Sequence, residues 1–128
     1  MGTDMNSKLI EKELRAMIIG CAMAVLNELG HGFREKTYEK AMIIEMLEKN
    51  LSVNQQVQYP VYYKNKLVDT FIPDLVVENK IIIELKTVDK ICDEHIGQVL
   101  NYLKVTGLEV GIIFNFKHSK LEWKPIVL

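Results

Sequence analysis

The sequence has little of what marks the more easily recognised classes of protein. It has two cysteines, Cys21 and Cys92, whose separation fits neither a CxxC motif nor another metal-ligand spacing. No segment approaches the roughly 20 apolar residues that a membrane-spanning helix needs. The start, MGTDMNSK, lacks the apolar region of a signal peptide. We therefore expect a cytoplasmic protein that does not enter a membrane.

An excess of basic charge is also missing. The net charge is -1 over 128 residues, which does not favour an extended phosphate-binding surface. Hydrophobic residues make up 48% and charged residues 26% of the chain, as in ordinary folded domains. This length predicts a single domain over residues 1–128, of which 1–7 form a flexible N-terminus. None of the three histidines has a second histidine or cysteine at ligand spacing, so we assign no histidine to a metal.

The spacing of apolar residues predicts the elements of the fold. Steps of three and four residues indicate helices, and period-two alternation rich in Val, Ile and Tyr indicates strands. The predicted helices cover 8–29, 34–50 and 93–106, and the predicted strands 53–63, 67–77, 81–87, 109–116 and 121–127. The second helix is expected to bury Tyr38, Ala41, Met42, Ile44 and Leu47. The order α-α-β-β-β-α-β-β, with a helix long enough for a crossover after the third strand, predicts an α/β or α+β fold with a mixed sheet.

The third predicted strand, IIIELKT, carries the main chemical signal. Period-two alternation places Glu84 and Lys86 on the same face of this strand. Asp74 lies on the preceding strand, and the turn near Asn79 should bring it close to Glu84. Two carboxylates suit a hard divalent cation such as Mg²⁺, and a nearby lysine can orient a water or stabilise charge. On spacing alone, however, an acid and a lysine two apart are also common on the polar face of a strand.

Two helical pairs could border such a site. Glu35 and Tyr38 are three residues apart at the start of the second helix, where an acid also favours the helix dipole and a tyrosine often packs in the core. Gln98 and Tyr102 are four apart on the helix that follows Lys86. A glutamine there could hold a water or a phosphate oxygen, although exposed helix glutamines are ordinary.

Together, these motifs resemble one family. The run GFREKTY matches the GxxExxY signature of a group of small microbial proteins placed in the PD-(D/E)xK nuclease superfamily. The resemblance continues through YPVYYKNKLVDTFIPDLVVENKIIIELKTV and HIGQVLNYLKVTGLEVGIIFNF, and covers roughly residues 28–127. The chain departs from the usual pattern at Ile72-Pro73, before Asp74. A proline there removes a backbone donor, so the strand should be irregular or at an edge.

The resemblance implies a restriction-endonuclease-like core, a mixed sheet flanked by helices. It implies that Asp74, Glu84 and the backbone carbonyl of Leu85 bind Mg²⁺, with Mn²⁺ as an alternative. Lys86 would then be the catalytic lysine and Glu35 the acid of the first core helix. Tyr38, Gln98 and Tyr102 would support the site.

Three functions are compatible with these residues. The first is a metal-dependent nuclease, acting on DNA in preference to RNA. The second is a catalytically silent module of the same fold that binds nucleic acid or a partner protein. The third is a subunit of a homodimer or a larger repair or defence assembly, for which an apolar patch with Leu9, Ile10 and Met17 would be the contact.

Overall fold

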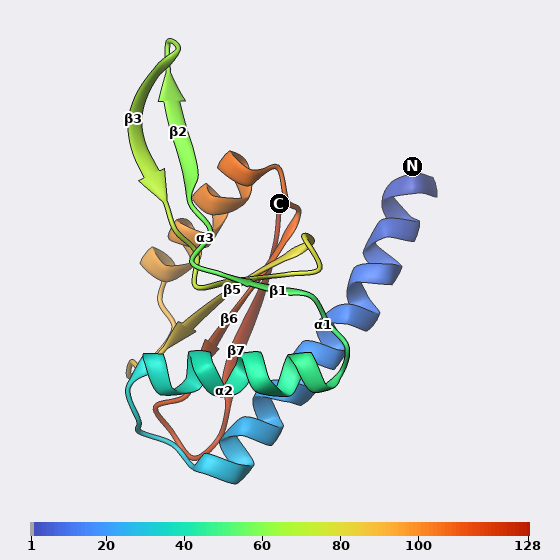
Figure 1. The fold of residues 1–128 in the computed structure, drawn as a ribbon, viewed down its shortest axis with the longest axis vertical. Coiled ribbons are helices and arrows are strands. Elements are labelled where there is room, and N and C mark those ends of the chain that lie inside the picture. The colour runs from blue at the N-terminus through green and yellow to red at the C-terminus, as the bar shows by residue number, and fades with distance from the viewer. Residues whose placement is uncertain (1) are drawn as a thin grey trace.

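The computed structural model describes the backbone of residues 2–128 and the side chains from residue 11 onward. The elements are α1 (Gly2–Leu29), α2 (Glu35–Glu48), β1 (Val53–Gln55), β2 (Tyr59–Tyr63), β3 (Lys66–Phe71), β4 (Leu75–Val77), β5 (Ile81–Lys86), α3 (Asp93–Thr106), β6 (Val110–Asn115) and β7 (Glu122–Val127). Figure 1 shows the helices around a central sheet, with β2 and β3 projecting from it as a narrow arm. No helix within the described residues is long and apolar enough to cross a membrane.

The central sheet has five strands in the order β1-β4-β5-β6-β7. β5 and β6 are parallel, with Ile81 opposite Val110, whereas the other neighbours are antiparallel. The crossover through α3 and the mixed sheet are therefore as predicted. β5 lies in the middle, and its residues 81–85 are all buried, which explains why they are apolar apart from Glu84.

Helices cover both faces of the sheet. Ile81, Ile83 and Leu85 of β5 point to the face that packs against α1 and α2. Ile82 points to the opposite face and packs with residues of α3 such as Val99 and Leu103. The alternation predicted for β5 thus divides the core into two clusters, and Glu84 and Lys86 belong to the face covered by α3.

Two predicted strands were wrong in extent, because each is interrupted. The predicted strand 53–63 breaks into β1 and β2, and Gln56 adopts a positive φ of 54° between them. The predicted strand 67–77 breaks into β3 and β4 across Ile72–Asp74, where Pro73 cannot donate to a ladder. β2 and β3 consequently leave the main sheet and pair only with each other.

The buried face of α2 was predicted only in part. Its buried residues are Tyr38, Glu39, Met42 and Met46. Ile44 and Leu47 lie off this stripe and are exposed, which corrects the prediction that they are buried. Helix α1 also begins earlier than predicted. Its Met17 is exposed, whereas the side chains of Leu9 and Ile10 lie outside the described residues.

The packing of α3 on the sheet depends on a glycine in β6. A Cβ atom on Gly111 would stand 2.5 Å from Cγ1 of Val99, a fully buried residue of α3. We expect Gly111→Ala to lower the free energy of unfolding by about 1–3 kcal/mol through overpacking, measured by urea denaturation. Gly20→Ala in α1 is the matched control. Nothing lies within 4 Å of its Cβ position, so it should stabilise by about 0.5–1 kcal/mol. Equal effects of the two substitutions would contradict this account.

Candidate active site

The β4–β5 hairpin brings Asp74 and Glu84 together. Its turn passes through Glu78 and Asn79, both at positive φ, and the ladder pairs Leu75 with Ile83. One residue further along, the side chains complete the pairing. The Asp74 amide donates to Oε2 of Glu84 at 2.7 Å, and the Leu85 amide donates to Oδ2 of Asp74 at 2.9 Å. The predicted proximity of Asp74 and Glu84 is therefore present.

The two carboxyl groups are shielded from water to different degrees, since Glu84 is buried and Asp74 is half-buried. Glu84 is only 4% exposed, and burial, together with the charge of Asp74, raises its pKa to about 8. Burial also raises the pKa of Asp74, which the charges of Glu39 and Glu35 raise further and that of Lys86 lowers. The site therefore holds more negative charge than Lys86 balances, which favours a proton or a cation beside the two carboxyl groups.

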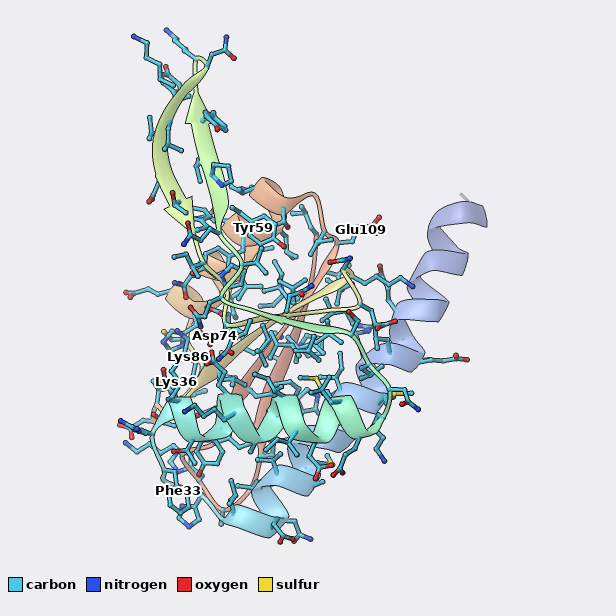
Figure 2. The ribbon with its side chains drawn as sticks, viewed as in Figure 1. Phe33, Lys36, Tyr59, Asp74, Lys86 and Glu109 are labelled. Carbon is cyan, nitrogen blue, oxygen red and sulfur yellow. The ribbon has the colours of Figure 1, made fainter. Side chains whose placement is uncertain are left out.

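Lys86 faces the helix that covers the site. Its Nζ lies 3.5 Å from Oε1 of Gln98, whose Nε2 donates to the hydroxyl of Tyr102 at 3.1 Å. Burial raises the pKa of Tyr102 to about 12, and the charges of Glu84 and Asp74 contribute. The structure thus joins Lys86, Gln98 and Tyr102 in one line along the site. Figure 2 shows Lys86 next to Asp74, at the edge of the sheet near the start of α2.

Glu35 lies at the mouth of the site. Its Oε2 accepts a hydrogen bond from the backbone amide of Thr87 at 3.2 Å. It is exposed, yet close enough for its charge to raise the pKa of Asp74. The first turn of α2 therefore meets the end of β5 immediately after Lys86.

Tyr38 is not part of this constellation. Its ring stacks on Phe116 with the ring centroids 4.3 Å apart, and its hydroxyl donates to the carbonyl of Gly30 at 2.7 Å. The same hydroxyl accepts from the amide of Phe33 at 3.1 Å. Tyr38 therefore anchors the turn before α2, and its contribution to the site is to fix where Glu35 begins the helix.

Glu39 is a residue that the sequence reasoning missed. It is 4% exposed and accepts hydrogen bonds from the side-chain amides of Gln55 at 2.7 Å and Gln56 at 2.9 Å, and from Lys36 at 2.9 Å. The backbone amide of Gln56 in turn donates to the backbone carbonyl of Asp74 at 3.2 Å. The available signal was its position four residues after Glu35 and beside Tyr38, on the stripe that α2 buries.

The chemistry of the donors fits a divalent cation held by few protein ligands. Within the described part of the chain, no group of three or more His, Cys, Asp or Glu side chains is placed to hold a metal ion. Mg²⁺, however, is commonly bound by one or two carboxylates, with waters and substrate phosphates completing its shell. Each carboxyl group of Asp74 and Glu84 uses one oxygen to accept the backbone hydrogen bond between the strands, which leaves the other oxygen to serve as a ligand.

Comparisons with known proteins bear on the family and the fold of this chain. A family model described as the PD-(D/E)XK nuclease superfamily matches residues 12–126. The crystal structure of SSO0001 is similar with a TM-score of 0.57 and 20% sequence identity, over 95% of this chain and 62% of that one. The chain therefore spans less than two thirds of that protein, and the likeness concerns the fold alone. The comparison with curated proteins gives no match. The predicted mixed sheet flanked by helices is confirmed.

The buried carboxyl of Glu84 makes the stability of the metal-free protein depend on pH. Its pKa is about 8 in the folded chain against an ordinary value of 4.5, so the folded state holds more protons between these values. The free energy of unfolding should therefore fall as the pH rises from 4.5 to 8. We expect the melting temperature in EDTA to drop across this window, and Glu84→Gln to flatten the drop. A profile that is the same in both proteins would contradict the prediction.

Removing the carboxylate of Glu39 should loosen the loop that supports Asp74. Glu39→Ala removes the buried acceptor of hydrogen bonds from three exposed residues, Lys36, Gln55 and Gln56. We expect it to lower the free energy of unfolding by about 1–3 kcal/mol, because hydrogen bonds to a charged group are among the stronger ones. The matched control is Glu48→Ala at the exposed end of the same helix, which should change it by less than about 0.5 kcal/mol. Urea denaturation measures both, and a similar loss in the two variants would show that Glu39 has no special role.

Proposed function

Because this chain belongs to the PD-(D/E)XK nuclease superfamily, we propose that it hydrolyses phosphodiester bonds in nucleic acid, with DNA as the favoured substrate. The observation that carries the proposal is the meeting of Asp74, Glu84 and Lys86 at one end of β5. The GFREKTY run favours the GxxExxY group within the superfamily. The proposed cofactor is Mg²⁺, with Mn²⁺ as an alternative.

Each polar residue has a distinct proposed role. Asp74, Glu84 and the backbone carbonyl of Leu85 hold the cation, which when bound polarises a phosphoryl oxygen and lowers the pKa of a bound water. Lys86 orients the attacking water and offsets the negative charge that develops on the phosphate. The neighbouring amide of Gln98 restrains the Lys86 side chain, and Tyr102 restrains that amide in turn.

Glu35 is the proposed catalytic acid contributed by α2. Its contact with the backbone amide of Thr87 holds the carboxylate at the open side of the site. There it can accept a hydrogen bond from a water that is bound to the cation. Glu39 acts through the backbone around Asp74 and is a positioning residue. Its replacement should therefore lower the affinity for the cation without removing a ligand.

The alternative is a silent module that binds nucleic acid or a partner protein without cutting. The net charge of -1 motivates it, since a protein that holds nucleic acid by its phosphates commonly carries a basic surface. Under this alternative, Asp74→Asn would leave binding of nucleic acid unchanged and no cation would promote cleavage.

Cleavage assays distinguish the two functions. We expect the purified protein to cut single-stranded or plasmid DNA in Mg²⁺ or Mn²⁺ and to lose this activity in EDTA. Lys86→Ala should lower the rate by about 10²–10³-fold, as loss of one group that stabilises transition-state charge does. Lys80→Ala, in the exposed turn at the other end of β5, is the matched control and should cut like the wild type.

The outcome that contradicts the nuclease is equally defined. It is the absence of metal-dependent cleavage by the wild type on DNA and RNA, whether single-stranded, duplex or branched. A rate in Lys86→Ala equal to that in Lys80→Ala would instead contradict the role given to Lys86.

A further inference from the structure

The β2–β3 arm exposes aromatic side chains that its own fold does not use. Tyr62 and Tyr63 are 63% and 64% exposed, and Leu67 and Val68 are 61% and 60% exposed. The turn at its tip, Lys64–Asn65, has positive φ at both residues, which is the geometry of a tight two-residue hairpin. In Figure 1 the arm rises away from the rest of the molecule. A projecting hairpin of this kind presents its side chains to a ligand.

The two faces of the arm differ. Tyr59 and Phe71 are paired at its base and pack against the cluster around α3, where the Phe71 ring lies 5.2 Å from that of Tyr102. The register shifts between Val61 and Tyr62, where β3 contributes an extra residue, so β2 itself keeps its alternation. Tyr63 follows Tyr59 by four residues on β2 and therefore lies on the same side of that strand, paired with Lys66. Tyr62 and its partner Leu67 lie on the other side.

A groove connects the base of the arm to the candidate active site. It has a volume of ≈ 670 Å³ and lies between the last residues of β3, at the base of the arm, and α3. Its lining includes Asp69, Thr70, Asn101, Gln98 and Tyr102. Gln98 and Tyr102 are also the residues next to Lys86, so the groove and the active site share a wall.

The chemistry of this path suits an unpaired strand of nucleic acid. The groove offers amides, hydroxyls and the two carboxylates of Asp69 and Glu94, which can accept hydrogen bonds from the edges of bases. The described residues that line it include no lysine or arginine that would attract phosphates. At the tip, Tyr63 is exposed and the Nζ of Lys64 lies 5.4 Å from its ring centroid, with Lys66 beside it. An aromatic ring next to lysines stacks on an unpaired base while the lysines contact the flanking phosphates.

The length of the arm sets how far such a strand would extend. Strands of five and six residues reach about 17–20 Å at roughly 3.3 Å per residue. The rise along the axis per nucleotide of a stacked strand is about 3.4 Å, and an extended unpaired strand covers more than this per nucleotide, so the tip would contact a nucleotide no more than about five positions from the groove.

We propose that the groove between β3 and α3, continued by the Tyr63 face of the β2–β3 arm, binds single-stranded DNA and leads it to the active site. This rests on the proposed nuclease function for its substrate class. The positive tip, in a chain whose net charge is -1, supplies the charge complementarity for the strand that leaves the groove.

Binding of labelled oligonucleotides in EDTA, where cleavage is suppressed, tests the proposal. For a 15-nucleotide single strand we expect Tyr63→Ala to weaken binding about 5- to 150-fold, the range that loss of one base stack produces. Lys64→Ala and Lys66→Ala should each reduce the slope of log affinity against log salt by about 0.7. Tyr62→Ala, on the opposite face and equally exposed, is the matched control and should bind like the wild type. A dinucleotide, which is too short to reach from the groove to the tip, should not distinguish Tyr63→Ala from the wild type.

Three results would overturn the proposal. They are unchanged binding of the 15-nucleotide strand by Tyr63→Ala, an equal loss in Tyr62→Ala, and stronger binding of blunt duplex or of single-stranded RNA than of single-stranded DNA. Circular dichroism checks that each variant is folded. Because these side chains are exposed, we expect the substitutions to leave the fold intact, so that a loss of binding reports on the contact with the strand.

A small substrate separates this proposal from the nuclease function. Bis(4-nitrophenyl) phosphate is a phosphodiester too short to reach the arm. Metal-dependent hydrolysis of it by the wild type and Tyr63→Ala alike, combined with weaker strand binding by Tyr63→Ala, supports both proposals. Strand binding that depends on Tyr63, with no cleavage of any substrate, keeps the binding path and rejects the nuclease. Hydrolysis combined with strand binding that does not depend on Tyr63 keeps the nuclease and rejects the binding path.

Discussion

The site depends on a pair of hydrogen bonds that replace one rung of a β-ladder. β4 begins only at Leu75, so the amide of Asp74 is left outside the regular pairing and donates to Glu84, while the amide of Leu85 donates to Asp74. Backbone donors next to a buried sheet must be satisfied, and here carboxylates satisfy them. The same bonds therefore hold two acids side by side, with Glu84 buried and Asp74 half-buried. Their mutual repulsion and desolvation create the local demand for positive charge.

The strand breaks that free Asp74 also shape the rest of the molecule. Because the chain leaves the main sheet after Gln55 and returns at Leu75, the segment between them forms a separate hairpin. Glu39 fastens the first break by holding Gln55 and Gln56, and the amide of Gln56 binds the carbonyl of Asp74 at the second break. The two interruptions thus support each other. Together, the two interruptions position the carboxylate of Asp74 and separate the β2–β3 arm, whose base packs against α3.

The sequence predicted what local periodicity encodes and missed what depends on distant contacts. The run Ile81–Leu85 and the turn before it were enough to foresee the central strand and the approach of Asp74 to Glu84, because register follows from alternation and turn length. Pro73 indicated an irregular or edge strand, because proline cannot donate to a ladder. A complete break there, and the one at Gln56, were not foreseen, since the apolar and aromatic residues on either side continue the strand pattern. Glu39 was missed because its burial depends on glutamines that only the fold brings to it. Ile44 was wrongly predicted to be buried because isoleucine is usually a core residue. The buried face of α2 instead follows Tyr38, Glu39, Met42 and Met46.

The near-neutral net charge is consistent with a nucleic-acid substrate once the charges are located. Four acids surround the candidate active site, where the charges of Glu35 and Glu39 act on Asp74 and that of Asp74 acts on Glu84. Lys64 and Lys66 lie at the tip of the arm. The net charge of the chain adds these negative and positive regions together, so that their charges cancel in the sum. A strand bound along the proposed path would meet the two regions one after the other. With little long-range attraction, such a protein would depend on base stacking and on the bound cation for affinity. That dependence would select substrates with unpaired ends, because only an unpaired base can leave its neighbours to stack on Tyr63.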